Sequence, residues 1–143
     1  MRVVDVKFSK GEEEFLRKHD QCALATLLNG SPHVVPVTYL FFDNTVWIRL
    51  ARGSRKHKNI VKTNRVAIVV YTHHPDRGVM IRGRAQFVTS KVELSRIDHE
   101  YHFHHKRTDN ENPFIKIVPT QKASWSDRRV TRGSRVVWLH QKL

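Results

Sequence analysis

The chain has 143 residues, 39% hydrophobic and 27% charged, a composition typical of one globular domain, and we expect a single domain over residues 1–143. Lysine and arginine number 26 against 13 acidic residues, a net charge of +13, which favours anionic partners such as phosphorylated ligands, nucleic acid or acidic lipid. The pattern argues against a membrane-spanning helix, a secretory signal and, with Cys22 as the single cysteine, an internal disulfide. We therefore expect a cytoplasmic protein.

The first third of the chain predicts a helix followed by a β-meander. Ser9 and Glu12 form a capping box at the start of a run that is first acidic and then basic, up to His19, and this predicts a short helix. Three β-branched and aromatic runs then follow, at 22–28, 33–42 and 45–51. The turn sequences NGSP and DN separate them, which favours antiparallel hairpins. Pro36 inside the second run indicates an edge strand or a bulge.

The middle of the chain predicts a second helix and two more strands. Ser54 is suited to cap a helix over 55–63, with Ile60 and Val61 facing the core. The apolar runs that follow predict strands at 65–71 and 79–88. Gly83 inside the second of these strands indicates a bulge or the close approach of another backbone.

The last part predicts a helix and the closing strands. Ser90 and Glu93 form a second capping box, which opens a helix that reaches about His105. Two separate closing strands are expected at 114–119 and 122–126, and a last one at 135–139. About six strands at short spacing with two or three helices predict a mainly β fold, a small antiparallel barrel with peripheral helices.

The segment 49–60, RLARGSRKHKNI, is the strongest candidate for a site. It lies between a strand end and a helix start, where the first helical amides lack partners and the helix dipole favours an anion. Arg55 offers a planar fork, Lys56 a point charge and Ser54 a hydroxyl, while Arg49 on the preceding strand is close enough to reach the same anion. The alternative is a basic helix end that only faces solvent.

Two stretches carry a family resemblance: GSRKHKNIVKTNRVAIVVY (53–71) and RGVMIRGRAQFV (77–88). They resemble the core of the pyridoxamine 5'-phosphate oxidase-like, FMN-binding split-barrel proteins, and residues 25–56 are similar to the opening meander of those proteins. The resemblance covers about 9–126 and leaves 127–143 as a basic C-terminal extension. It implies a six-stranded antiparallel split β-barrel of Greek-key topology, and a homodimer with the cofactor, FMN, at the subunit interface.

Carried over residue by residue, the resemblance assigns cofactor binding to Val35, Pro36, Val37, Thr38, Arg49, Leu50, Ser54, Arg55, Lys56 and Trp125. Arg55 and Lys56 would hold the phosphate, and the strand that contains Pro36 would run under the flavin ring. The oxidases have a tyrosine where this chain has Arg49. The resemblance assigns no catalytic residue to the chain, which suits a reaction carried out by the cofactor.

The chain departs from the oxidases at one of their flavin contacts and in their C-terminal substrate motif. Gly78 stands where they have a glutamine that contacts flavin from the partner subunit, and their C-terminal Arg-x-His motif is absent. We therefore expect a flavin-dependent oxidoreductase that acts on a small molecule other than pyridoxamine phosphate. The alternatives are a reductase that uses the deazaflavin coenzyme F-420, whose anionic tail would suit Arg49, and a non-catalytic flavin- or polyanion-binding protein.

Two further patterns receive simpler interpretations. His99, His102 and His105 recur at helical spacing, but no carboxylate or cysteine pattern accompanies them, so we assign no metal and expect an interface or a pH-sensitive helix. The basic residues lack interleaved exposed aromatics on one strand face, which argues against nucleic acid as the partner.

Overall fold

The structure is a computed structural model that describes residues 6–105, 112–129 and 134–136 of the chain. Its elements in chain order are α1 (Lys10–Lys18), β1 (Gln21–Leu28), β2 (Ser31–Phe42), β3 (Thr45–Arg49), α2 (Arg55–Lys62), β4 (Arg65–Thr72), β5 (Arg77–Phe87), α3 (Lys91–His105), β6 (Phe114–Arg129) and β7 (Ser134–Val136).

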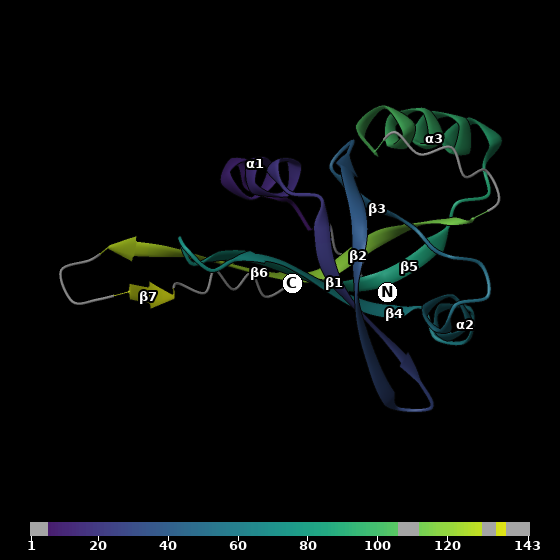
Figure 1. Cartoon of the computed structure of the whole chain (residues 1–143), viewed down its shortest axis with the longest axis horizontal. Helices are drawn as coiled ribbons and strands as arrows, with labels where there is room; N and C mark the ends of the chain where they lie inside the picture. The colour runs from purple at the N-terminus through teal and green to yellow at the C-terminus, as the bar shows by residue number, and fades with distance from the viewer. Residues whose placement is uncertain (1–5, 106–111, 130–133, 137–143) are drawn as a thin grey trace.

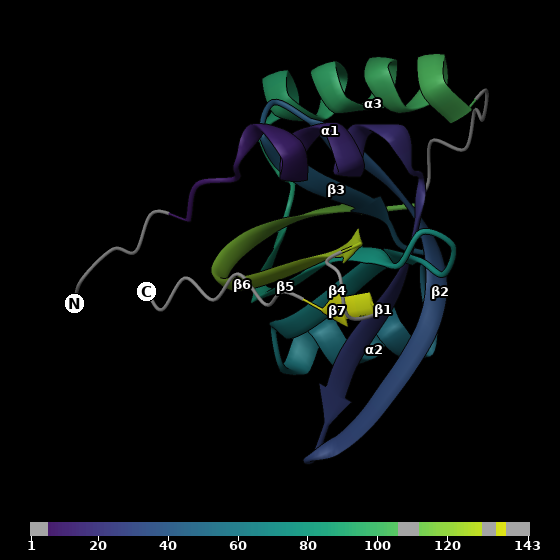
Figure 2. The ribbon, with the colours of Figure 1, turned by 90° about the vertical axis from the view of Figure 1, so that its left-hand side faces the viewer.

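Six strands close into an antiparallel barrel in the order β3-β2-β1-β4-β5-β6, and β3 pairs back onto β6. The strand β7 pairs with the far end of β6, which projects from the barrel (Figure 1). Helices α1 and α3 lie at one end of the barrel and α2 at the other (Figure 2). The predicted mainly β fold, a six-stranded antiparallel barrel with peripheral helices, is confirmed. No helix in the described part of the chain is long and apolar enough to cross a membrane.

The local signals of the N-terminal third form the structures they predict. The hydroxyl of Ser9 accepts a hydrogen bond from the Glu12 amide at 3.2 Å, and the Glu12 carboxylate accepts one from the Ser9 amide at 2.8 Å, which completes the capping box. Asn29 and Gly30 turn between β1 and β2 with φ of 50° and 76°. Because both angles are positive, this two-residue turn keeps the right-handed twist of its strands.

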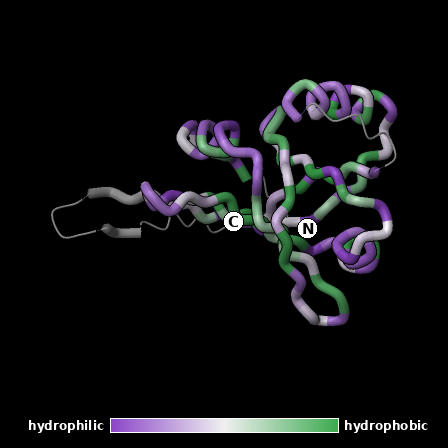
Figure 3. Tube along the Cα trace, in the orientation of Figure 1, coloured by the Kyte–Doolittle hydropathy of each residue, from purple (hydrophilic) through white to green (hydrophobic). Residues whose placement is uncertain are grey.

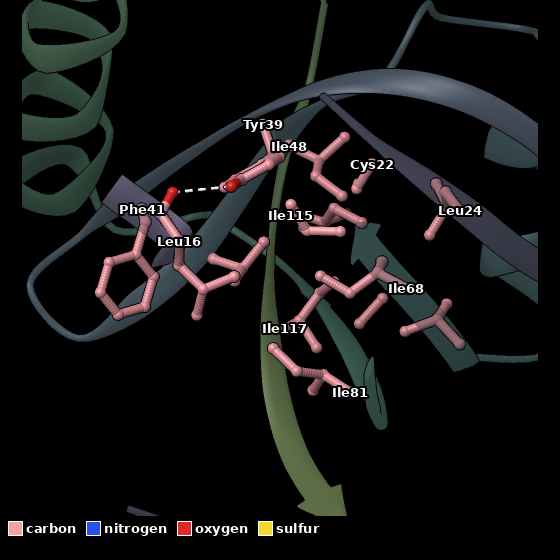
Figure 4. Close-up of a cluster of buried hydrophobic side chains, with 14 of the residues drawn as sticks. Leu16, Cys22, Leu24, Tyr39, Phe41, Ile48, Ile68, Ile81, Ile115 and Ile117 are labelled. Atoms are coloured by element: carbon pink, nitrogen blue, oxygen red, sulfur yellow. Dashed lines mark hydrogen bonds between the residues drawn. The ribbon is translucent and has the colours of Figure 1, made fainter. Parts of the chain in front are cut away.

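The core fills the barrel with the inward-facing side chains of all six strands (Figure 4). Hydrophobic positions recur along the strands of the barrel (Figure 3). The Tyr39 hydroxyl lies in the core and donates to the Leu16 carbonyl at 2.6 Å, which fastens α1 to β2. A second, smaller cluster lies under α3 and consists of Leu40, Trp47, Val88, Ile97, Tyr101 and Phe114.

Three expectations about individual elements are corrected or left open. The two closing strands expected at 114–119 and 122–126 are one strand, β6, because a register shift between Arg82 and Gly83 absorbs the break at Pro119. Val61 is 63% exposed rather than buried, because helical spacing turns it away from the face that buries Ile60. The last strand expected at 135–139 lies mostly outside the described residues.

Gly83 is required at this register shift, and its replacement tests the bulge. A Cβ at Gly83 would lie 2.2 Å from the Val118 carbonyl oxygen, whereas one at Gly11 in α1 would meet nothing within 4 Å. Gly83→Ala should therefore lower the free energy of unfolding by roughly 1–3 kcal/mol, the usual cost of overpacking, while Gly11→Ala should leave it unchanged or raise it by up to about 1 kcal/mol. Urea unfolding of both variants measures this, and an unchanged midpoint for Gly83→Ala would contradict the bulge.

A buried ion pair between Glu12 and Lys122 connects α1 to β6. The side chains are 5% and 4% exposed and their N–O distance is 2.5 Å. Burial alone would raise the pKa of the Glu12 carboxyl, but hydrogen bonds from Lys122, the Ser9 amide and Ser124, and the charge on Lys122, hold that pKa below its usual value of 4.5. The unfolded chain therefore binds this proton more readily than the folded one.

The pair predicts a loss of stability in acid. The contribution of Glu12 is complete above pH 4.5 and disappears as the pH falls through the lower pKa of the folded state. At neutral pH, Glu12→Gln should cost roughly 3–5 kcal/mol, because Lys122 is left buried without its counterion, and the deficit should shrink as the pH falls. Urea titrations from pH 7 to pH 3 measure the effect. Glu14→Gln, at an exposed position of the same helix, is the control. An equal loss in the free energy of unfolding for both variants would contradict this interpretation.

Candidate functional site

The main candidate site is a cavity of about 440 Å³ where β3 ends and α2 begins. This is a usual size for a small-molecule site. Five elements, the turn between β3 and α2 and the loop before β6 contribute its lining, which consists of Gln21, Pro36, Val37, Thr38, Arg49, Ala51, Lys56, Tyr101 and Asn112.

A tight turn leads from β3 into α2 and determines where the helix begins. The Ser54 amide donates to the Ala51 carbonyl at 3.1 Å, and Gly53 has a φ of 77°, a conformation that favours glycine. The Ser54 hydroxyl then accepts from the His57 amide at 3.3 Å and caps the helix. Because these contacts are local, the sequence is sufficient to place Lys56 in the first turn of α2.

The position of α2 on the barrel is determined by a buried polar contact. The side-chain amide of Asn59 donates to the Thr26 hydroxyl of β1 at 3.0 Å, and both residues are only 1% exposed. A buried hydrogen bond of this kind is costly to leave unmade. It therefore fixes the position of α2 on β1, and with it the start of the helix beside the cavity.

The charges at the start of α2 are those that the helix itself disfavours. Arg55 and Lys56 lie at its positive end, and its first turn contains no acidic residue, although acidic side chains stabilise this end of a helix. Lys56 lines the cavity, and its amine makes no ion pair within the described residues. An anion in the cavity would compensate the lysine, the dipole and the unpaired amides together.

One edge of β2 is free beside the cavity. Residues Ser31 to Thr38 of β2 pair with β1, whereas β3 pairs only with the following stretch, Tyr39 to Phe42. No strand in the described ranges pairs with the other edge of Val35–Thr38. Pro36, which has no N–H to leave unsatisfied, is suited to such an edge. The strand therefore leaves backbone groups of this edge unpaired at this side of the cavity.

Arg49 contributes a second cation from the last residue of β3. Its side chain is 8% exposed and forms an ion pair with Asp98 of α3 at 3.0 Å. The guanidinium carbon lies 4.5 Å from the ring centre of Phe114 and 5.5 Å from that of Tyr101. Its Nη1 atom is buried and has no hydrogen-bond acceptor among the residues that the structure describes.

The family profile of pyridoxamine 5'-phosphate oxidase matches residues 8–126. The chain belongs to the pyridoxamine 5'-phosphate oxidase family. Among curated protein sequences, none matches the chain.

Solved structures share the fold of this pyridoxamine 5'-phosphate oxidase family member. The conserved hypothetical protein Rv2991 from Mycobacterium tuberculosis has a TM-score of 0.74 at 23% identity, over 96% of each chain. The FAD-binding protein from Mycobacterium smegmatis has a TM-score of 0.66 at 20% identity, over 82% of this chain and 93% of that one. HutZ, the heme storage protein from Vibrio cholerae, has a TM-score of 0.67 at 14% identity, over 76% of this chain and 87% of that one.

Within one chain of this family member, Trp125 lies away from the candidate cavity. It lines a second cavity of about 450 Å³, beside α1 and the turn between β4 and β5. Its indole N–H donates to Asp76 at 3.0 Å, and it lies opposite Gly78 in the ladder. A Cβ at Gly78 would lie 2.0 Å from the indole ring, so the glycine is what allows the tryptophan to pack there.

The structure brings together half of the residues that the family resemblance assigns to the cofactor. Those that line the candidate cavity are Pro36, Val37, Thr38, Arg49 and Lys56. Val35 lies beside them on β2, and Ser54 caps α2. Arg55 is exposed in the first turn of that helix, and Leu50 is buried completely in the core.

Four lining residues were missed by the sequence analysis: Gln21, Ala51, Tyr101 and Asn112. Tyr101 belongs to the apolar face of α3, where spacing indicates burial and not a site. Asn112 reaches the cavity from the loop before β6, and its side chain accepts from the Arg52 amide at 3.0 Å. Ala51 lies within the segment 49–60 that the sequence singles out, whereas no local signal could have found the other three, because barrel closure brings their segments together.

Proposed function

We propose that this protein is a flavin-dependent oxidoreductase that holds FMN in the candidate cavity. The observation that carries the proposal is the pairing, in one cavity, of a free strand edge with a cationic helix start. The edge of β2 at Pro36–Thr38 suits the hydrogen-bonding rim of a flavin ring, and Lys56 with the first amides of α2 suits its phosphate. Bound flavin supplies hydride or electron transfer, while these groups bind it and orient it.

The comparisons support flavin binding and leave a second candidate function. Membership of the oxidase family and a neighbour called an FAD-binding protein support a flavin. The neighbour HutZ is called a heme storage protein, which is a binding role and not the name of an oxidoreductase. A non-catalytic flavin-binding protein is therefore the second candidate.

The substrate that we propose is a small molecule other than pyridoxamine phosphate. The oxidase glutamine is replaced by Gly78, and the indole of Trp125 fills the space above it. The C-terminal Arg-x-His motif is absent from the sequence. The substrate motif of the oxidases and one of their flavin contacts are thus changed, while the cations at the start of α2 are present.

We also propose a homodimer, supported by an apolar outer face beside the candidate cavity. Val69 of β4 lies opposite Ala23 of β1 and Met80 of β5, and Ala23 lies opposite Pro36. Half-buried small or apolar residues continue this face at Ala25 and Ala67. Contiguous exposed apolar faces usually mark interaction sites, and a second copy seated here would lie next to the cofactor.

Cofactor binding is tested by the loss of one cation. Purified protein should take up FMN with the absorbance of a bound flavin, and it should bind FMN more tightly than riboflavin, which lacks the phosphate. Lys56→Met should weaken FMN roughly 10- to 100-fold, the usual value of a charge-assisted contact, and leave riboflavin unchanged. Fluorescence titration measures both affinities, and Lys62→Met at the other end of α2 is the matched control.

Three other outcomes separate the alternatives. A protein that binds neither flavin nor coenzyme F-420 would contradict the proposal. Tighter binding of coenzyme F-420 than of FMN would replace the cofactor with the deazaflavin. Bound flavin that neither NADH nor NADPH reduces would favour the non-catalytic function.

The dimer is tested by a charge placed on the outer face. Val69→Glu should convert the dimer to a monomer, since a carboxylate buried against apolar groups is strongly unfavourable, and it should lower FMN affinity. Val92→Glu is the control, because Val92 is 79% exposed on α3, away from this face. Light scattering coupled to gel filtration gives the mass, and a Val69→Glu protein that stays dimeric would place the interface elsewhere.

A further inference from the structure

The Arg49 side chain is buried at a point where the barrel closes. Arg49 is the last residue of β3 and pairs with Phe114 of β6. Its guanidinium lies over the Phe114 ring, and only 8% of the side chain is exposed. Burying a charged group at this depth is expensive unless it is paired and hydrogen-bonded.

The described residues satisfy only part of this guanidinium. The Nη2 atom of Arg49 donates a hydrogen bond to the Asp98 carboxylate at 3.0 Å. Its Nε atom donates to the backbone carbonyl of Asn112 at 3.4 Å, near the limit for a hydrogen bond. Nη1 has no acceptor in the described part of the chain. The unmet donor belongs to a side chain that lines the candidate cavity, so a ligand oxygen there could supply what the protein does not.

Packing alone does not account for an arginine at this position. A methionine or leucine could fill the space between Phe114 and Tyr101 without burying a charge. Asp98 compensates the charge only partly, because its side chain is 46% exposed and therefore screened by solvent. The residue types fit an anion receptor that is complete only when a ligand is bound.

The two cations of the cavity are held on different sides of it. Lys56 belongs to α2, whereas Arg49 is held against Asp98 and Tyr101 of α3, and these helices lie at opposite ends in both views (Figures 1 and 2). The cavity reaches both. The contacts that hold Arg49 come from α3, β6 and the loop before β6, so a phosphate at the start of α2 would leave its Nη1 donor for another group.

We propose that Arg49 binds an oxyanion other than the phosphate held at the start of α2. Its chemistry is that of a carboxylate or phosphate oxygen, which a guanidinium binds with directed hydrogen bonds. The source is either a second anionic group on the cofactor or a separate small anion. The inference rests on the proposed function, because it assumes that a flavin phosphate occupies the Lys56 position.

The experiment compares flavins that differ by one anionic group at a time. Riboflavin, FMN and riboflavin 5'-diphosphate are titrated into the wild-type protein, Arg49→Met, Arg49→Lys and Lys56→Met. Arg96→Met is the control, because Arg96 is an exposed, ion-paired arginine of α3. A second arm adds inorganic phosphate to the FMN-loaded protein and follows its thermal midpoint.

The expected pattern assigns one anion to each cation. Wild type should bind the diphosphate roughly 10-fold more tightly than FMN. Arg49→Met should lose this step in affinity from FMN to the diphosphate, and Arg49→Lys should keep part of it. Lys56→Met should lose the step from riboflavin to FMN instead. If the diphosphate has no advantage, but inorganic phosphate raises the midpoint of the FMN-loaded wild type and not of Arg49→Met, the second anion is a separate molecule.

Two results would overturn the inference. One is an Arg49→Met protein with wild-type affinity ratios and a wild-type response to phosphate, which would make Arg49 a packing residue. The other is an equal loss of the riboflavin-to-FMN step in Arg49→Met and Lys56→Met, which would mean that both cations share one phosphate. A misfolded Arg49→Met leaves Arg49→Lys to decide, since it keeps the charge and loses the planar fork.

Failure of the proposed function has a different signature. If no flavin binds, that function is wrong, and the anion receptor is tested alone with inorganic pyrophosphate on the flavin-free protein. A rise in thermal midpoint for wild type that Arg49→Met lacks would support the binding of an anion by Arg49. No rise in either protein would contradict it.

Discussion

The ladder between β3 and β6 is the constraint on which the rest of the structure depends. It closes the barrel, and its last rung joins Arg49 to Phe114. The chain continues the same contact one residue further, where the Leu50 amide donates to the Pro113 carbonyl at 2.9 Å. Both walls of the candidate cavity, the turn into α2 and the loop before β6, begin at this rung. Without closure there would be no cavity.

The cavity departs from what stability alone would select. Cations lie at the positive end of α2, a buried guanidinium lacks an acceptor, and a strand edge is left free beside them. Each departure is unfavourable in the free chain, and each would be compensated by an anionic, planar ligand. Elsewhere the capping box of α1 follows the ordinary rules, and the buried charges of Glu12 and Lys122 pair with each other. Local rules broken together at one place indicate function.

The flavin proposal and the anion receptor concern one cavity but rest on different groups. The first depends on Lys56, on the start of α2 and on the edge of β2, which the family resemblance assigns to the cofactor. The second depends on Arg49, where the chain departs from the pattern of the oxidases. The two proposals thus assign a ligand to two of the cations of this basic sequence.

The sequence by itself determined what is local: the capping box at Ser9, the turns at Asn29–Gly30 and Asp43–Asn44, the bulge at Gly83 and the cap at Ser54. These depend on residues close along the chain, and family resemblance extended them to a barrel and to Lys56. The tertiary structure alone decided that β6 is one strand, that Leu50 is core and that Tyr101 and Asn112 line the cavity. It also decided that Arg49 meets Asp98, because contacts between distant segments follow from how the barrel closes, and no local pattern encodes that.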